Sequence, residues 1–188
     1  MTAVILAGGK SRRMGRDKLS LPQGNTTVLN AAVERFSAVF DRVYISVRDR
    51  GRYPDAGAPE IEDIFKDCGP MGGLYSSLET AGESIFLVAA DLPFSDPLLA
   101  KSIIASRGNS EICITVDGCG RYEPLFGYYD YSVKEAAKSL LLQGKYKMAE
   151  LYSICRTKTL QPEELHGMWR ETAFQNMNFP EDYEKLFK

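Results

Sequence analysis

The chain has 188 residues, which suits one domain with a single sizeable core, and we expect residues 1–188 to form that one domain. Its composition, 44% hydrophobic and 26% charged residues, is that of an ordinary globular protein. The formal net charge of −2 gives no bulk attraction to nucleic acid or to a membrane surface, so we expect neither as a partner. No apolar stretch approaches the length of a membrane span, and the N-terminus does not have the pattern of a secretory signal.

The four cysteines contain no Cys-x-x-Cys pair, and the chain has one histidine, so a zinc site is not expected. Cys113 lies in an apolar run, where a reduced cysteine behaves as a small hydrophobic residue. We therefore expect reduced thiols and a cytoplasmic protein.

Apolar runs typical of strands alternate with segments of helical periodicity, which predicts an α/β fold with a largely parallel sheet. The first strand, residues 2–7, is apolar throughout and should be buried on both faces. Further strands are expected at 43–47, from 61, and at 84–89, 111–116, 122–129 and 154–160. Helices are expected at 28–40, 71–80, 97–105, 133–142 and 181–187. Strands 111–116 and 122–129 flank a glycine turn and should pair antiparallel, which would make the sheet mixed.

The first strand opens directly into a glycine-rich cationic segment that ends at Lys18. Gly8 and Gly9 lack a Cβ, so the backbone can approach phosphate oxygens, and successive N–H groups in such a turn form an anion-binding concavity. Arg13 and Lys18 add positive charge. The spacing fits neither a P-loop nor the dinucleotide fingerprint, but it does predict a triphosphate cradle.

Asp91 lies just past the carboxyl end of the apolar strand 84–89, where open α/β sheets bind their ligands. Mg²⁺ prefers one or two carboxylates together with phosphate oxygens, so Asp91 is the candidate metal ligand. The alternative is a helix-capping aspartate, for which Asp96 is the better candidate. A second glycine cluster at 69–73, with Pro70 at the expected helix start, is typical of a binding loop.

Four segments resemble motifs of the molybdenum cofactor guanylyltransferases, a branch of the nucleotidyltransferases: residues 6–18, 63–74, 90–94 and 174–183. The first segment alone also resembles the cytidylyltransferase and sugar-nucleotide branches. The resemblance implies a three-layer αβα, Rossmann-like nucleotidyltransferase fold with a mostly parallel mixed sheet, and Mg²⁺ as cofactor. It assigns nucleotide binding to Leu6, Ala7, Gly8, Gly9, Lys18, Ser46, Asp63 and Asp91, with Arg13, Lys18 and Asp91 acting on the phosphates.

Asp63 matches an acidic residue that contacts the nucleotide in the guanylyltransferases, and a carboxylate can accept from both N1–H and N2 of guanine. The alternative is a solvated acidic face, since Glu60, Glu62 and Asp67 are close in sequence. The chain departs from the family pattern at Ser46, where the family has an asparagine near the nucleotide.

The segment 174–183 resembles the guanylyltransferase C-terminus, in which a paired Asn-x-Asn precedes Pro-Glu. In a strand, residues two apart share a face, so Asn176 and Asn178 would present their amides together to the acceptor. Helix capping by Asn178 is the alternative, and it leaves Asn176 unexplained.

The resemblance implies transfer of GMP from GTP to the terminal phosphate of molybdopterin, with release of pyrophosphate. A phosphate monoester is largely dianionic at neutral pH, so the reaction needs positioning and charge neutralisation more than a general base. The product implies transient contact with a molybdoenzyme or its chaperone. The alternatives are a cytidylyltransferase or sugar-phosphate nucleotidyltransferase, and a non-catalytic GTP-binding protein.

Overall fold

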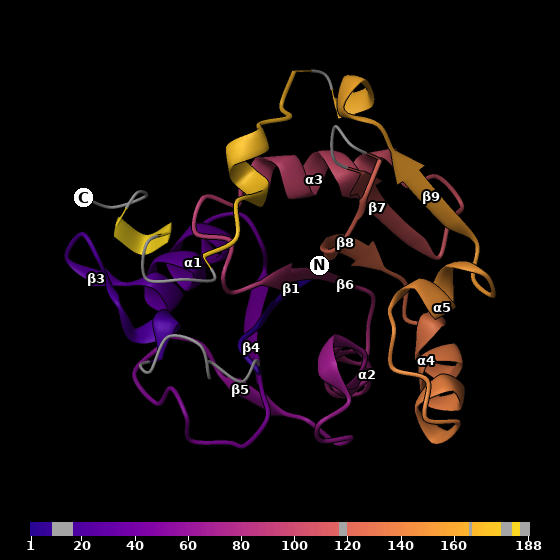
Figure 1. Ribbon diagram of the computed structural model, residues 1–188, viewed down its shortest axis with the longest axis horizontal. Coiled ribbons are helices and arrows are strands. Elements are labelled where there is room, and N and C mark those ends of the chain that lie inside the picture. The colour runs from indigo at the N-terminus through magenta and orange to yellow at the C-terminus, as the bar shows by residue number, and fades with distance from the viewer. Residues whose placement is uncertain (9–16, 117–119, 166, 178–181, 185–188) are drawn as a thin grey trace.

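The computed structural model describes residues 1–8, 17–116, 120–165, 167–177 and 182–184, and its centre is a seven-stranded sheet with the order β5-β4-β1-β6-β8-β7-β9 (Figure 1). The pairs β1/β4, β1/β6, β4/β5 and β7/β9 are parallel, while β8 runs antiparallel to both β6 and β7, as predicted. The strands are β1 (Thr2–Leu6), β4 (Arg42–Val47), β5 (Glu60–Glu62), β6 (Ile85–Ala89), β7 (Ile112–Val116), β8 (Tyr122–Tyr129) and β9 (Thr157–Leu160).

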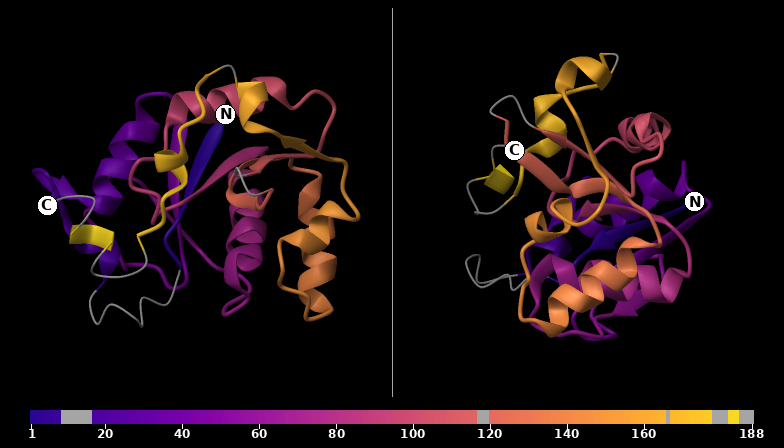
Figure 2. Two further views of the ribbon diagram at one scale, coloured as in Figure 1. Left: turned by 45° about the horizontal axis from the view of Figure 1, so that its top comes forward. Right: turned by 90° about the vertical axis from the view of Figure 1, so that its right-hand side faces the viewer.

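Helices cover both faces of the sheet, which gives the predicted three layers (Figure 2). On one face α1 and α3 pack on the sheet, and on the other face α2, α4 and α5 do so. The α-helices are α1 (Val28–Ser37), α2 (Gly69–Ala81), α3 (Pro97–Ser106), α4 (Val133–Leu142) and α5 (Ala149–Tyr152). None of these helices, nor any other within the described residues, is long and apolar enough to cross a bilayer.

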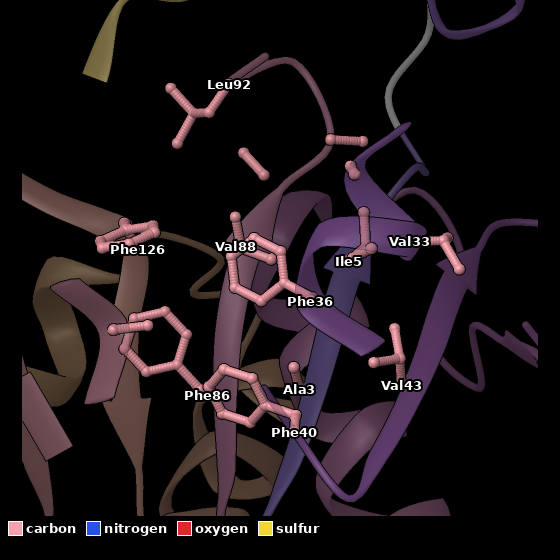
Figure 3. Close-up of a cluster of buried hydrophobic side chains, with 14 of the residues drawn as sticks. Ala3, Ile5, Val33, Phe36, Phe40, Val43, Phe86, Val88, Leu92 and Phe126 are labelled. Atoms are coloured by element: carbon pink, nitrogen blue, oxygen red, sulfur yellow. The ribbon is translucent and has the colours of Figure 1, made fainter. Parts of the chain in front are cut away.

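The alternation of side chains along β1 divides the core into two clusters. Ala3 and Ile5 join the cluster under α1 and α3, which Figure 3 shows around the rings of Phe36, Phe86 and Phe126. Val4 joins the opposite cluster under α2 and α4. Strand β1 is buried on both faces because helices cover both faces of the sheet. This explains why its sequence is apolar without the alternation of a half-exposed strand.

The expected elements are present, with differences at their ends. Helix α1 ends at Ser37 rather than at residue 40, and Val39 and Phe40 form a further turn in which both donate their N–H groups to the Phe36 carbonyl. Strand β9 begins at Thr157 rather than at 154, because residues 149–152 form the short helix α5.

Short elements add to the expected set. They are the antiparallel hairpin of β2 (Pro22–Gln23) and β3 (Thr26–Thr27), and the 3₁₀ turns η1 (Lys18–Ser20), η2 (Pro162–Leu165) and η3 (Glu171–Phe174). These elements have two to four residues each and carry no hydrophobic periodicity. Within the expected helix 181–187 the structure describes residues 182–184, and these are helical.

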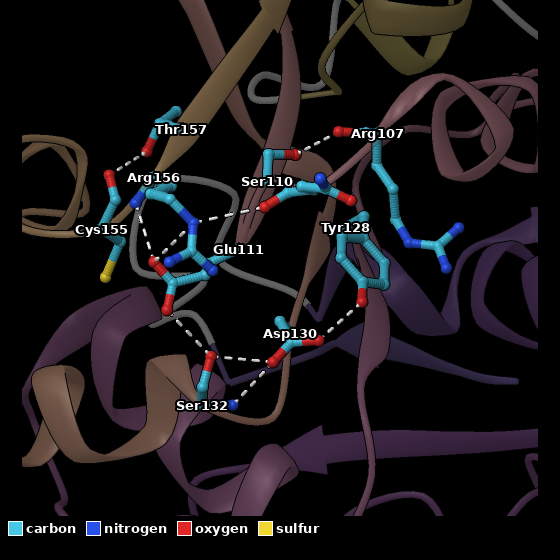
Figure 4. A network of polar contacts seen from close by, with 10 residues as sticks. Arg107, Ser110, Glu111, Tyr128, Asp130, Ser132, Cys155, Arg156 and Thr157 are labelled. Atoms are coloured by element: carbon cyan, nitrogen blue, oxygen red, sulfur yellow. Dashed lines mark hydrogen bonds and ion pairs between the residues drawn. The ribbon is translucent and has the colours of Figure 1, made fainter.

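A polar network fixes the edge of the sheet at which β7 and β9 begin and β8 ends (Figure 4). Glu111 accepts from the Ser132 hydroxyl at 3.1 Å and from the Arg156 backbone N–H at 2.9 Å. Asp130 accepts from the Tyr128 hydroxyl at 2.9 Å and from the Ser132 backbone N–H at 3.0 Å. The antiparallel β8 is thereby held at this edge, and its first residues lie at the opposite edge, where the parallel strands end.

Candidate active site

A cavity of ≈ 400 Å³ lies at the carboxyl ends of the parallel strands β1, β4 and β6. This is the position at which open α/β sheets place their ligands. The strand ends are held together by backbone hydrogen bonds from Ala7 N–H to the Ser46 carbonyl (2.8 Å) and from Ala90 N–H to the Leu6 carbonyl (3.0 Å). The cavity is lined by Leu6, Ala7, Gly8, Lys18, Leu19, Ser46, Arg48, Asp63, Asp67, Gly69, Pro70, Gly73, Ala89, Ala90, Asp91 and Leu125.

Seven of the eight residues assigned to nucleotide binding therefore meet in one cavity, although they come from five separate stretches of the chain. They are Leu6, Ala7, Gly8, Lys18, Ser46, Asp63 and Asp91. Gly9, Arg13 and Asn178 lie outside the described residues. Their expected roles remain predictions.

Asn176 is exposed and does not line the cavity. Residues 175–177 are in no strand, so the strand geometry that would give Asn176 and Asn178 a shared face is absent from the described part of this segment. The neighbouring residue, Met177, instead donates its backbone N–H to the Asp91 carbonyl at 3.0 Å. Asn176 thus lies next to the residue that touches the strand end, and its role toward an acceptor remains a prediction.

Lys18 is one of two cationic side chains, with Arg48, among the described residues that line the cavity. Its ammonium donates to Asp91 Oδ2 at 2.7 Å and to the Met177 carbonyl at 2.9 Å, and the side chains of Lys18 and Asp91 are 17% and 24% exposed. Because the pair is only partly exposed, water screens it less than a surface ion pair. The contact engages one of the two carboxylate oxygens of Asp91.

The backbone around Lys18 is fixed by its neighbour Asp17. The Asp17 carboxylate caps η1 by accepting from Leu19 N–H at 3.2 Å, and it also accepts from the Tyr53 hydroxyl at 2.7 Å and from Arg52 at 3.2 Å. Burial, together with this hydrogen bond and the charge of Asp17, raises the pKa of the Tyr53 hydroxyl well above its usual value, so it stays a donor. The segment between β4 and β5 therefore supports the position of the lysine.

Asp63 follows β5 and its carboxylate lies between two glycines. A Cβ added to Gly8 would be 3.5 Å from Asp63 Oδ2, and one added to Gly73 would be 3.7 Å from Oδ1. The Ser46 hydroxyl donates to Oδ1 at 3.2 Å. Burial raises the pKa of the Asp63 carboxyl to about 6, against the lowering effect of the Ser46 hydrogen bond and with a smaller raising contribution from Asp49. A half-buried carboxylate in a cavity does not fit the alternative of a solvated acidic face.

Two glycines of α2 allow the helix to approach the strand ends. A Cβ on Gly72 would lie 2.5 Å from the Phe65 carbonyl oxygen, and a Cβ on Gly73 would lie 2.6 Å from Leu6 Cδ2 and 2.9 Å from Ser46 Oγ. All three distances are shorter than normal van der Waals contact, so an alanine would force its neighbours to shift: the Phe65 backbone for position 72, and the Leu6 and Ser46 side chains for position 73. The cluster 69–73, expected as a loop ahead of a helix from residue 71, instead forms the first turns of α2, and Gly69, Pro70 and Gly73 line the cavity. Its role in binding remains a prediction.

Sequence reasoning missed several contributors to the cavity, among them Arg48, Asp67 and Leu125. Arg48 and Asp67 both line it and pair at 3.0 Å. Arg48 directly follows β4, so the strand-end rule that found Asp91 would also have found Arg48. Leu125 comes from the antiparallel β8. The strand itself is predicted from the sequence, but no local sequence pattern indicates that Leu125 would line the cavity.

The donor set of the cavity fits a magnesium ion bound together with phosphate. Asp91 presents a hard carboxylate at the strand end, and among the described residues no group of three or more His, Cys, Asp or Glu side chains could enclose a metal alone. Mg²⁺ is typically held by one or two carboxylates with phosphate oxygens and water completing its shell. Asp91 is the residue that would hold it.

A mixed sheet with a lysine and a carboxylate at its strand ends is an arrangement that fits the binding of nucleotide phosphates. Residues 3–160 match the family model of the MobA-like NTP transferase domain, so the chain belongs to this family of nucleotidyltransferases. The fold and family expected from the sequence are thereby confirmed.

Two curated relatives match nearly the whole chain. The chain is 30% identical over 190 residues to a probable molybdenum cofactor guanylyltransferase of Carboxydothermus hydrogenoformans, with 100% of this chain and 95% of the relative covered. It is 33% identical over 188 residues to a molybdenum cofactor guanylyltransferase of Campylobacter jejuni, with 99% and 95% covered. The fold is similar to that of molybdopterin-guanine dinucleotide biosynthesis protein A from Archaeoglobus fulgidus, with a TM-score of 0.86 and 24% identity over 100% of this chain and 97% of that one.

Proposed function

We propose that this chain transfers GMP from GTP to the terminal phosphate of molybdopterin. The acceptor phosphate oxygen forms a bond to the α-phosphorus of GTP, the bond from that phosphorus to the bridging oxygen breaks, and pyrophosphate leaves with the electron pair. The observation that carries the proposal is that Lys18, Asp91 and Asp63 line one cavity. Lys18 and Asp91 are suited to binding phosphates and a metal ion, and Asp63 is suited to binding a base. The names of the two curated relatives support the choice of substrates.

Gly8, Lys18 and Asp91 line the cavity and, in this proposal, bind the phosphates. In this proposal Lys18 donates to the nucleotide phosphates and stabilises the charge that builds up as pyrophosphate leaves. The attacking phosphate is mostly dianionic at neutral pH, so no side chain has to remove a proton from it. Mg²⁺, held by Asp91, would supply Lewis-acid charge neutralisation at the phosphates.

The base end of the cavity is formed by Asp63, held by Ser46. In this proposal the ionised carboxylate accepts from the N1–H and the N2 amino group of guanine. Adenine has no donor at these places, and a buried carboxylate left without a donor costs about 1–3 kcal/mol or more. Ser46 donates to the Asp63 oxygen and so has a role in the orientation of this carboxylate, although the family pattern has an asparagine there.

We propose that the reaction takes place in the cytoplasm, which is supported by the free thiols of Cys68, Cys113 and Cys155. Delivery of the product would follow by transient contact with a molybdoenzyme or its chaperone. No described surface is assigned to that contact.

Calorimetric titration with GTP, CTP, ATP and UTP in the presence of Mg²⁺ tests the nucleotide choice. We expect GTP to bind at least tenfold more tightly than the others, the factor that about 1.4 kcal/mol of hydrogen bonding gives. A preference for CTP would keep the reaction class and replace the substrate. Tight GTP binding without pyrophosphate release in the presence of molybdopterin would instead support a non-catalytic GTP-binding protein.

A further inference from the structure

The C-terminal segment 169–177, here called the strap, has an aromatic anchor at one end. The Trp169 and Phe174 rings stack at 4.4 Å between centroids with an interplanar angle of 22°. Phe174 also meets the edge of Phe126 at 5.4 Å and 87°, and Phe126 is fully buried against Phe86. Phe174 is 8% exposed, so the anchor is part of the core on the α1 and α3 face.

The other end of the strap lies on the site. Met177 is fully buried, its N–H donates to the Asp91 carbonyl at 3.0 Å, and its carbonyl accepts from the Lys18 ammonium at 2.9 Å. The backbone of Met177 is thus hydrogen-bonded to the main chain of Asp91 and to the Lys18 ammonium, and in the proposed reaction the Asp91 carboxylate and this ammonium face the nucleotide phosphates. Two of the three donors of the ammonium are taken by Asp91 and Met177, which leaves one direction for a phosphate oxygen.

A single contact would leave this lysine mobile. A lysine side chain has about 2 kcal/mol of rotamer entropy, and a carboxylate is a partner it can meet in several geometries. The backbone carbonyl of a buried residue, by contrast, has a fixed direction. The position of that carbonyl depends on where the strap is seated, three residues after Phe174.

We propose that Phe174 is a positioning residue of this site. By seating the strap on Phe126 it fixes the Met177 carbonyl, which holds the Lys18 ammonium against Asp91 and directs it toward the phosphates. The contact pattern is a property of the chain itself, and its consequence for turnover rests on the proposed function.

Competitive amine labelling tests the position of Lys18 without any substrate. The probe is acetic anhydride, and the readout is the acetylation rate of the Lys18 peptide by mass spectrometry, with the exposed Lys145 as internal reference. We expect Phe174→Ala to raise the Lys18 rate about tenfold, the factor given by the loss of about one hydrogen bond to a charged group. An unchanged Lys18 rate in a folded Phe174→Ala protein would overturn the proposal.

Phe40→Ala is the matched control for lost core packing. Phe40 is 5% exposed and packs on Phe86 in the same core cluster, but its contacts are with Phe36 and Phe86 rather than with the strap. We expect Lys18 labelling in Phe40→Ala at the wild-type rate. Equal increases in both variants would show general loosening and would count against a positioning role. If Phe174→Ala fails to fold, Phe174→Leu is subjected to the same comparison.

A double-mutant cycle tests the consequence for turnover. If Phe174 acts through Lys18, Phe174→Ala lowers kcat/KM for GTP about tenfold in the wild-type background and has no further effect in a Lys18→Ala background. Effects that multiply in the double variant would contradict the proposal. Absence of GMP transfer in the wild-type protein would refute the proposed function, while the labelling result would still decide whether the strap positions Lys18.

Discussion

The Lys18–Asp91 pair shows how a charged site is kept ready in a chain with little net charge. The two groups are 2.7 Å apart and each is less than a quarter exposed, so either charge alone would be costly at this position. Together they neutralise one another until a metal and a polyphosphate arrive with complementary charge. We therefore interpret the pair as a resting arrangement in which each group keeps a partner.

Removing the charge of Asp91 should abolish most of the turnover. We expect Asp91→Asn to reduce pyrophosphate release from GTP and molybdopterin about 100-fold or more, because the reaction loses its metal ligand and the charge stabilisation that the metal supplies. The dependence of the residual rate on Mg²⁺ concentration is the second readout, and it should weaken.

Asp96→Asn is the matched control for this change. Asp96 caps α3 by accepting from Leu98 N–H at 2.8 Å, and asparagine caps a helix about as well as aspartate. Its activity should equal that of the wild type. Full Mg²⁺-dependent turnover in Asp91→Asn would remove the metal assignment.

Titration of Asp63 should be visible in nucleotide affinity. Because burial raises the pKa of this carboxyl to about 6, it is ionised at pH 8 and largely protonated at pH 5. The protonated form cannot accept two hydrogen bonds from guanine, so GTP affinity should fall as the pH is lowered through 6. Calorimetry between pH 5 and 8, on the wild type and on Asp63→Asn, measures this fall in GTP affinity. The variant should bind GTP weakly, with an affinity that does not change between these pH values.

The same raised pKa has a defined effect on stability. In the native state the Asp63 carboxyl keeps its proton to a higher pH than in the unfolded chain, where an aspartate has a pKa of about 3.9. The native state therefore loses stability relative to the unfolded chain as the pH rises from about 4 to 6. Asp63→Asn should therefore be more stable than the wild type above pH 6 and similar to it below pH 4. A variant with the same stability difference at both ends of this range would contradict the burial of Asp63.

At the level of elements, two adjacent glycines in α2 are expected to behave differently. An alanine at position 72 meets the backbone carbonyl of Phe65 at 2.5 Å, and a backbone group yields only if the loop moves. We expect Gly72→Ala to lower the free energy of unfolding by about 1–3 kcal/mol, measured by urea denaturation, since this overpacking outweighs the gain of about 1 kcal/mol in helix propensity.

Gly73→Ala is the natural comparison. Its Cβ would meet the ends of two side chains, Leu6 and Ser46, which can rotate away. The stability of this variant should stay near that of the wild type, while GTP affinity falls because Ser46 must leave its hydrogen bond to Asp63. A loss of stability larger than that of Gly72→Ala would show that the strand ends, rather than the loop, are the rigid part.

The sequence predicts the main helices and strands and part of the site, and each success has a physical reason. Hydrophobic periodicity locates β1, β6 and α4 within one residue at each end, because each packs one or both faces on the core. Asp91 is found because a buried strand ends just before it. Lys18 and Met177 are 159 residues apart, and their contact depends on tertiary packing that no local pattern encodes.

At the scale of the whole molecule, the strap lies outside the stretch 3–160 that matches the family model, yet it packs into the same core. We expect a single cooperative unfolding transition for residues 1–188. Trp169, the one tryptophan of the chain, reports the strap by fluorescence, and far-UV circular dichroism reports the sheet and helices. The two urea midpoints should coincide; an earlier fluorescence transition would show that the strap unfolds separately from the domain.

In the proposed reaction the α-phosphate of GTP is transferred to the pterin. A reaction of the protein with Mg²⁺, molybdopterin and GTP labelled either at the α- or at the γ-phosphate, with the products separated by chromatography, tests this transfer directly. We expect the α label in a dinucleotide with molybdopterin and the γ label in pyrophosphate. Retention of both labels in GTP, or transfer of α label only from CTP, would contradict it.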